Sequence, residues 1–234
     1  MRAIRFVLGL LLIPVCVALT RAAAALVVSV RPASGGMLAA PAWAFGGGCL
    51  LWVILFCALP RPARVYVLAH ELSHALWGAA MGASVVRMRV GREGGSVTLS
   101  KSNFLITLAP YFFPLYTVLA IGAYYLLAAF FAVEAYALWW LGLVGFTWAF
   151  HVTFTLSSLL RRQSDIQEYG HLLSYAVIYA FNVLGICLWV VLVTSATMEQ
   201  MVAALCHEST VTALTMWRAA QAAWTRLRPA APPR

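Results

Sequence analysis

Six apolar stretches, each about as long as a membrane-crossing helix, dominate the sequence. They cover residues 6–29, 42–60, 63–81, 104–132, 135–160 and 171–196. About 20 mostly apolar residues are enough to cross the hydrocarbon core of a bilayer as a helix. A chain with so many of these stretches cannot fold in water with them exposed. The sequence therefore predicts an all-α polytopic membrane protein with about six transmembrane helices.

Composition and charge agree with a membrane protein and argue against other classes. Hydrophobic residues make up 63% of the chain and charged residues 10%, whereas soluble domains carry about 25% charged residues. The net charge of +9 is spread over segment ends and polar stretches, which favours a lipid bilayer as partner and not nucleic acid. None of the five cysteines forms a C-x-x-C pair, so neither a disulfide framework nor a thiolate metal site is expected.

The chain is predicted to form one membrane domain with a short tail. Residues 1–200 contain no flexible linker, and the core of this domain is expected at about 60–190. The start of the chain resembles a signal peptide, but a retained first membrane segment is favoured because the later stretches stay in the bilayer anyway. Residues 201–234 form an amphipathic, basic tail with a Pro-rich end. A helix from Met198 to Arg228 is expected to lie on the membrane surface, with a disordered end after it.

Two irregular features are expected between the apolar stretches. Residues 84–90 and 96–100 alternate polar and apolar side chains on either side of the glycine-containing segment 91–95, which predicts a short β-hairpin. Pro110 and Pro114 lie inside the fourth apolar stretch. Internal prolines free backbone carbonyls in a membrane helix, so this stretch should be kinked or unwound.

The third apolar stretch contains the motif H-E-x-x-H as His70, Glu71 and His74. On a helix, residues i and i+4 share a face, so the two imidazoles can hold one zinc ion while Glu71 acts as general base toward a water. Ionisable groups inside an apolar segment are costly and usually functional. The simpler interpretation is that the three polar groups only hydrogen bond to one another within the helix bundle.

A catalytic zinc needs a third protein ligand, and Asp165 is the first candidate. It is the only aspartate in the chain and lies in a polar break between the fifth and sixth stretches. It could instead be a solvated carboxylate paired with Arg161 or Arg162. Three other residues compete as ligands: Glu168, His151 and His171. Glu134 lies at a segment end on the wrong side to reach the metal.

These motifs together resemble the site-2 protease family of intramembrane zinc metallopeptidases, in a compact bacterial form. The resemblance rests on the H-E-L-S-H helix, the hairpin after it, the segment 102–114 and the Gln-Ser-Asp165 sequence. It implies that His70, His74 and Asp165 bind Zn²⁺ and that Glu71 is the catalytic base. It also implies that the hairpin accepts an unwound substrate as an extra strand, and that Asn103 and Pro110 contact the substrate near the scissile bond. Asn103 could instead be a helix N-cap that opens the fourth stretch.

The expected function is therefore cleavage of peptide bonds in or near the transmembrane segments of membrane-protein substrates. A second hypothesis is a zinc protease that cuts loops or soluble peptides at the bilayer surface. A third is a non-catalytic membrane protein, such as a metal-binding protein, a protease-like chaperone or a transporter. The expected location is the bacterial inner membrane, as a multi-pass protein. The oligomeric state does not follow from the sequence.

The orientation in the membrane is not decided by the sequence. If all six stretches cross the bilayer, the sixteen basic residues divide eight against eight between the two sides. The positive-inside rule then favours neither arrangement. The cluster of basic residues in and around the hairpin, Arg87, Arg89, Arg92 and Lys101, suggests a cytoplasmic hairpin.

Overall fold

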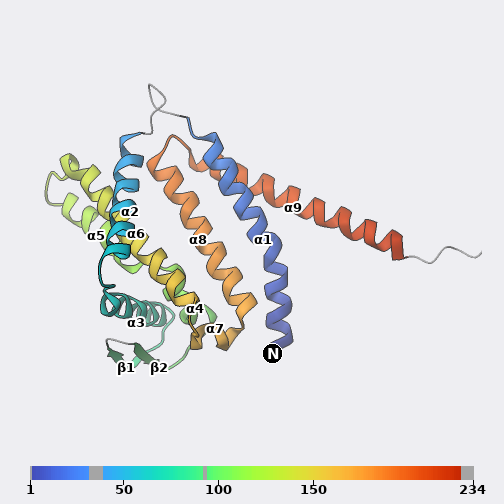
Figure 1. The fold of residues 1–234 in the computed structure, drawn as a ribbon, viewed down its shortest axis with the longest axis horizontal. Helices are drawn as coiled ribbons and strands as arrows, with labels where there is room; N and C mark the ends of the chain where they lie inside the picture. The colour runs from blue at the N-terminus through green and yellow to red at the C-terminus, as the bar shows by residue number, and fades with distance from the viewer. Residues whose placement is uncertain (1, 32–38, 92–93, 228–234) are drawn as a thin grey trace, which may run out of the picture.

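The computed structural model describes residues 2–31, 39–91 and 94–227, and it is mostly helical (Figure 1). The helices are α1 (Arg2–Ser29), α2 (Ala40–Ala58), α3 (Ala63–Ala80), α4 (Phe104–Phe112), α5 (Leu115–Ala128), the short η1 (Glu134–Tyr136), α6 (Ala137–Leu159), α7 (Ser164–Tyr169), α8 (His171–Val193) and α9 (Met198–Leu227). The strands β1 (Val85–Val90) and β2 (Gly95–Leu99) form one antiparallel pair.

Among the described residues, four helical segments are long and apolar enough to cross a membrane: α1, α2, η1 with α6, and α8. The bent pair α4 and α5 would be a fifth. Large apolar side chains such as Leu11, Val28 and Leu192 are exposed on these helices, and a surface of this kind indicates contact with lipid. The mostly helical fold is confirmed, and its long apolar helices are those expected of a membrane protein; four or five candidate spans are found among the described residues, where about six were predicted. Helix α3 fills the third predicted stretch but is not among the candidate spans.

The bundle has two distinct ends (Figure 1). The end that carries α3, β1, β2, α4, α7 and the N-terminus of α1 is called the site end below. The opposite end carries the C-terminal ends of α1 and α8, the start of α2 and the connection between α5 and α6. Helix α3 lies across the site end, whereas α1, α2 and α8 run from one end to the other.

Glycines allow the long helices to pack backbone against backbone. Gly48 of α2 lies against Gly142 of α6, and Gly145 of α6 lies against Phe45 of α2. Gly9 of α1 packs in the same way on the start of α8 at Leu173. Small residues of this kind let membrane helices approach closely and increase their van der Waals contact. These contacts tie α2 to α6 and α1 to α8, and the apolar cluster of Phe45, Val144 and Val193 joins α2 and α6 to α8.

Both predicted irregular features are present. The fourth stretch breaks between Phe112 and Leu115, and α4 and α5 meet at a bend of 74°. Pro114 stands at this break, while Pro110 is accommodated inside α4. The hairpin pairs Val90 with Gly95 at its closed end. The two residues at the centre of its turn lie outside the described part of the chain.

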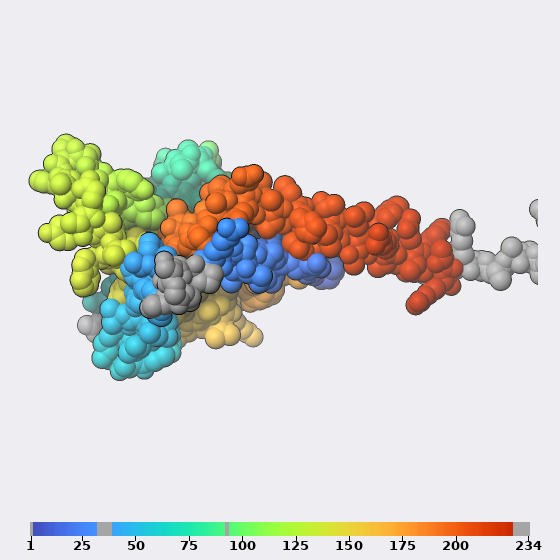
Figure 2. Space-filling view, turned by 90° about the horizontal axis from the view of Figure 1, so that it is seen from above, coloured from blue at the N-terminus to red at the C-terminus, as the bar shows by residue number. Residues whose placement is uncertain are grey.

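The predicted C-terminal helix is observed as α9, which extends beyond the bundle (Figure 2). Its first half packs on α1, where Arg21 and Glu208 form an ion pair with an N–O distance of 2.6 Å. Its second half is exposed and carries Trp217, Arg218 and Arg226. The Pro-rich end, 228–234, which was predicted to be disordered, lies outside the described residues.

Candidate metal centre

Helix α3 presents His70, Glu71 and His74 to the interior of the site end. The three residues span little more than one helical turn, so their side chains leave the helix on neighbouring sides. Glu71 and His74 are buried and His70 is half-buried. Tyr66, one turn before His70, donates a hydrogen bond from its hydroxyl to Ser158 on α6 at 2.9 Å. This bond ties the first half of α3 to the end of a long helix.

Asp165 reaches the same place from the short helix α7. Gly170 ends α7 with a positive φ of 91°, a conformation that glycine adopts without strain. Arg5 of α1 holds the far end of α7, because its side chain donates to the Glu168 carbonyl and lies 4.8 Å from the centre of the Tyr169 ring. These contacts fix the helix that carries Asp165 against α1.

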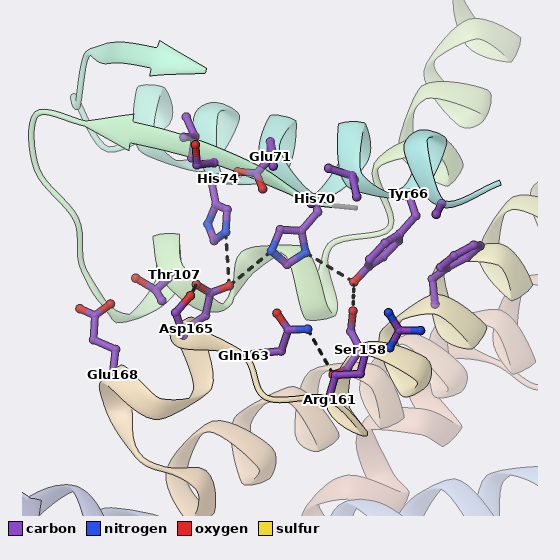
Figure 3. A pocket seen from close by; sticks show the side chains of 18 of the residues that line it. Tyr66, His70, Glu71, His74, Thr107, Ser158, Arg161, Gln163, Asp165 and Glu168 are labelled. Atoms are coloured by element: carbon purple, nitrogen blue, oxygen red, sulfur yellow. Dashed lines mark hydrogen bonds and ion pairs between the residues drawn. The ribbon is translucent and has the colours of Figure 1, made fainter. Parts of the chain in front are cut away.

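The ligand atoms of the two histidines and Asp165 converge. The Nε2 atoms of His70 and His74 lie 3.3 Å and 3.5 Å from Oδ2 of Asp165, and the three ligand atoms all lie within 4.8 Å of one another (Figure 3). Two ligands of a tetrahedral zinc, each about 2.0–2.1 Å from the ion, are roughly 3.3 Å apart. The spacing therefore fits a divalent cation held by three protein ligands.

The outer contacts of these ligands prepare them for a cation. Nδ1 of His74 lies 2.8 Å from the carbonyl oxygen of Ile106, which can only accept, so the proton of a neutral His74 is on Nδ1. Nε2 then faces a carboxylate oxygen with its lone pair. Two acceptors meet in this way only when a proton or a metal ion lies between them. The Tyr111 hydroxyl donates to the same Asp165 oxygen at 3.0 Å, and outer partners of this kind orient metal ligands in many sites.

The two carboxyl groups of the site, Asp165 and Glu71, differ in the direction of their pKa shifts. Burial alone would raise the pKa of the Asp165 carboxyl, but its contacts with His70 and His74 outweigh burial and hold its pKa well below the usual value. Burial raises the pKa of Glu71, although the nearby histidines and a backbone hydrogen bond from Val97 oppose the rise. Asp165 is therefore an anion suited to a cation ligand. Glu71 is a separate carboxylate of greater proton affinity.

A cavity of about 650 Å³ opens over these residues. Residues of α3, β2, the end of α6 and α7 line it, and Figure 3 shows His70, His74 and Asp165 pointing toward one another within it. Tyr66, Ser158 and Arg161 lie at one end, and Thr107 and Glu168 lie at the other. A polar cavity at the end of an apolar bundle gives water access to the site.

Of the candidate third ligands, Asp165 lies with the two histidines and the others do not, among the described residues. Glu168 lines the cavity but lies outside the group of converging ligand atoms, as far as the described residues show. His151 is buried behind the site and lines a second, much smaller cavity with His70. His171 begins α8 and packs beside Tyr175. Glu134 is at the opposite end, in η1.

Asn103 and Pro110 do not line the large cavity. The Asn103 side chain caps α4 by accepting a hydrogen bond from the Ile106 backbone at 3.0 Å, which was the alternative interpretation of this residue. Pro110 is buried in α4 and lines the small cavity beside His151. The positions of both residues thus explain the shape of α4, and neither residue faces the space above the converging ligands.

Sequence reasoning missed several groups that complete the site. Residues 164–169 were expected only as part of a polar break, but they form α7, and Gly170 after them is a common signal of a helix end. Tyr66 could have been found from its place four residues before His70 on the same helix. The roles of Tyr111 and of the Ile106 carbonyl could not be predicted from the sequence, because their contacts depend on how α4 packs against α3 and α7.

Comparisons of the chain with models of protein families, with curated proteins and with solved structures give no match. The function must therefore be inferred from the chemistry of the site and from its place in the bundle.

Proposed function

We propose that this chain is an intramembrane zinc metallopeptidase of the site-2 protease type, which hydrolyses peptide bonds in or near the transmembrane segments of membrane proteins. The observation that carries the proposal is the convergence of His70, His74 and Asp165 beside Glu71 in one cavity. Nitrogen and oxygen ligands of this kind suit zinc, and three protein ligands leave a position open for water or substrate, as in catalytic zinc sites.

Glu71 is the catalytic base in this proposal. A zinc ion bound by the three ligands would lower the pKa of a water molecule and polarise a substrate carbonyl. Glu71 lines the cavity and is held by the Val97 backbone, so it is placed to accept a proton from a water in the cavity and later return it to the leaving amine. Metal binding alone would not need this second carboxylate.

Strand β2 offers a place for the substrate backbone. Gly95, Ser96 and Val97 of β2 line the cavity, and within the described residues β2 pairs only with β1. An extended peptide can add to a free strand edge through main-chain hydrogen bonds. A substrate helix that unwinds at the membrane boundary could place its scissile bond over the ligands in this way.

The close contact between β2 and Glu71 predicts that adding a single methyl group at Gly95 lowers kcat. In Gly95→Ala the new Cβ would lie 2.7 Å from Cγ of Glu71 and 2.8 Å from its Oε1, so the carboxylate or the strand must move. We expect kcat to fall by about 10- to 100-fold, because small displacements of catalytic groups have effects of this size. Zinc content should not change. The measurement is turnover and bound metal in the same preparation.

Gly94→Ala is the matched control for this substitution, because a Cβ at Gly94 meets no atom within 4 Å. Turnover should stay close to that of the unmodified protein. Equal losses in the two variants would mean that general flexibility of the hairpin matters and that the Glu71 contact does not.

Removal and return of metal test the proposed function itself. Purified protein in detergent is incubated with fluorescent peptides that contain a transmembrane segment and its flanks. We expect cleavage to stop after treatment with a zinc chelator and to return when zinc is added back. Cleavage that persists in chelated protein with no bound metal would refute the proposal.

We further propose five membrane crossings, by α1, α2, α4 with α5, α6 and α8, with the site end in the cytoplasm. Because α3 lies across the site end, the polar segments before and after it stay on the same side of the membrane (Figure 1). That end then carries most of the basic residues near the spans: Arg2, Arg5, Arg61, Arg64, Arg87, Arg89, Lys101, Arg161 and Arg162. An excess of this kind marks the cytoplasmic side.

Two single-cysteine variants test this orientation. In a background without the five native cysteines, Thr98→Cys places a thiol on β2 and Glu134→Cys places one at the opposite end; both positions are exposed. In intact spheroplasts, a membrane-impermeant maleimide should label only the cysteine at 134. After lysis it should label both. Labelling of the cysteine at 98 before lysis would show that the site end lies outside the cytoplasm, which would contradict the proposed orientation.

A further inference from the structure

Two arginines line the cavity, one shortly before Tyr66 in the sequence and one shortly after Ser158, and the side chains of Tyr66 and Ser158 are hydrogen bonded to each other. Arg61 precedes α3 and Arg161 follows α6, and both line the cavity together with Tyr66, Ser157 and Ser158. In the described part of the chain, the ion pairs at N–O distances up to 4.0 Å include neither of these arginines. The cavity is therefore lined by two arginines that form no ion pair in the described part of the chain.

Local structure limits the freedom of the Arg61 side chain and fixes the backbone of Arg161. Arg61 stands between Pro60 and Pro62, whose rings restrict the backbone on each side. Its guanidinium lies 4.5 Å from the centre of the Phe56 ring, a favourable cation–π distance. Arg161 is in the turn that ends α6, where its backbone N–H donates to the Ser158 carbonyl at 2.9 Å. A charged group held before the ligand arrives loses less entropy on binding.

We propose that Arg61 and Arg161 form a subsite for a carboxylate of the peptide substrate, with the Ser157 hydroxyl as an additional donor. The inference rests on the peptidase function proposed above and makes it more specific. Paired guanidinium groups bind carboxylates through charge-assisted and often bidentate hydrogen bonds. The carboxylate belongs either to a Glu or Asp side chain or to the free C-terminus of the peptide.

The position of the subsite sets its distance from the cleaved bond. Helix α3 leads from Ala63, beside Arg61, to His70. At about 1.5 Å per helical residue these seven steps cover about 10 Å, which is the length of about three residues of an extended peptide. The acidic group should therefore lie about three residues from the scissile bond, on the side that occupies the Tyr66 end of the cavity.

The chain offers matched control residues. Arg162 is adjacent to Arg161, Arg64 is the second residue of α3 and close to Arg61 in sequence, and all four arginines are exposed. Neither Arg162 nor Arg64 lines the cavity. If the basic residues of this region only contacted lipid headgroups, the two members of each pair would be equivalent. A substrate carboxylate in the cavity would distinguish Arg61 and Arg161 from their neighbours.

The test uses reporter peptides in vesicles of zwitterionic lipid. One series moves a single Glu, with Gln as reference, through the residues that flank the cleavage site, and a second compares free and amidated C-termini. We expect one position about three residues from the cut to raise kcat/KM about tenfold, the effect of a hydrogen bond to a charged group. Arg61→Gln and Arg161→Gln should abolish this preference. Arg64→Gln and Arg162→Gln should keep it.

Binding of the same peptides to Glu71→Gln protein, measured by fluorescence anisotropy, separates the two proposals. If no peptide is cleaved by the unmodified protein but the Glu peptide still binds more tightly, the peptidase proposal fails and the carboxylate subsite stands. If cleavage occurs and Glu, Gln, free and amidated peptides are treated alike, the subsite is refuted. Equal loss of the preference in Arg161→Gln and Arg162→Gln also refutes it.

Discussion

Replacing Glu71 with Gln should abolish cleavage and leave the metal in place. The amide has nearly the size of the carboxylate, so α3 and the contact with β2 should be kept, but it cannot accept a proton at neutral pH. Loss of a general base lowers rates by about 10²- to 10⁴-fold. Because His70, His74 and Asp165 supply the three converging ligand atoms, bound zinc should be unchanged. Turnover and zinc per chain are measured on the same sample.

Glu168→Gln is the control for this loss of charge, because Glu168 lines the same cavity without joining the converging ligand atoms among the described residues. It should retain cleavage. Normal cleavage by Glu71→Gln would remove the assigned base. Such a result would favour a non-catalytic role for the site, as in a metal-binding protein or a transporter.

Replacing Gly48 with Val should strongly destabilise the helix bundle. A Cβ at Gly48 would lie 1.9 Å from the carbonyl oxygen of Gly142 and 2.8 Å from its carbonyl carbon. Both atoms belong to the backbone of α6, so no side-chain rotation can relieve the clash and α2 must move away from α6. Overpacking in a tight core costs about 1–3 kcal/mol and sometimes more. The midpoint of thermal unfolding in detergent should fall.

Gly46→Val provides the comparison, because it lies on the same helix and its Cβ would meet no atom within 4 Å. It should unfold at nearly the temperature of the unmodified protein. If Gly48→Val is as stable as Gly46→Val, α2 and α6 do not pack in the manner described here.

The main elements of the fold could be predicted because their signals are local. Apolar runs of sufficient length mark membrane helices, and alternation around glycines marks the hairpin. The number of crossings could not be read in this way. Helix α3 is as long as a span, but Arg64, His70, Glu71 and His74 lower its hydropathy and it is not among the candidate spans; it also lies across the site end (Figure 1). Counting it as a crossing gave the even division of basic residues.

The candidate site was predictable to the extent that it lies on one helix. The spacing of His70 and His74 places both on one face of α3 without any tertiary information. Asp165 is distant in sequence, and its choice over Glu168, His151 or His171 needed the packing of α7 on α4 and α8. Arg61 and Arg161 lie in two loops that are distant in sequence, so no local sequence pattern could have placed both of them at the same cavity.

Zinc content is the most direct test of the central claim. Protein purified in detergent without added metal should contain about one zinc per chain, and His70→Ala, His74→Ala and Asp165→Ala should each lose most of it. His171→Ala, which changes a histidine at the start of α8, should retain it. Folded protein free of zinc, or equal zinc in all of these variants, would contradict a metal centre built from His70, His74 and Asp165.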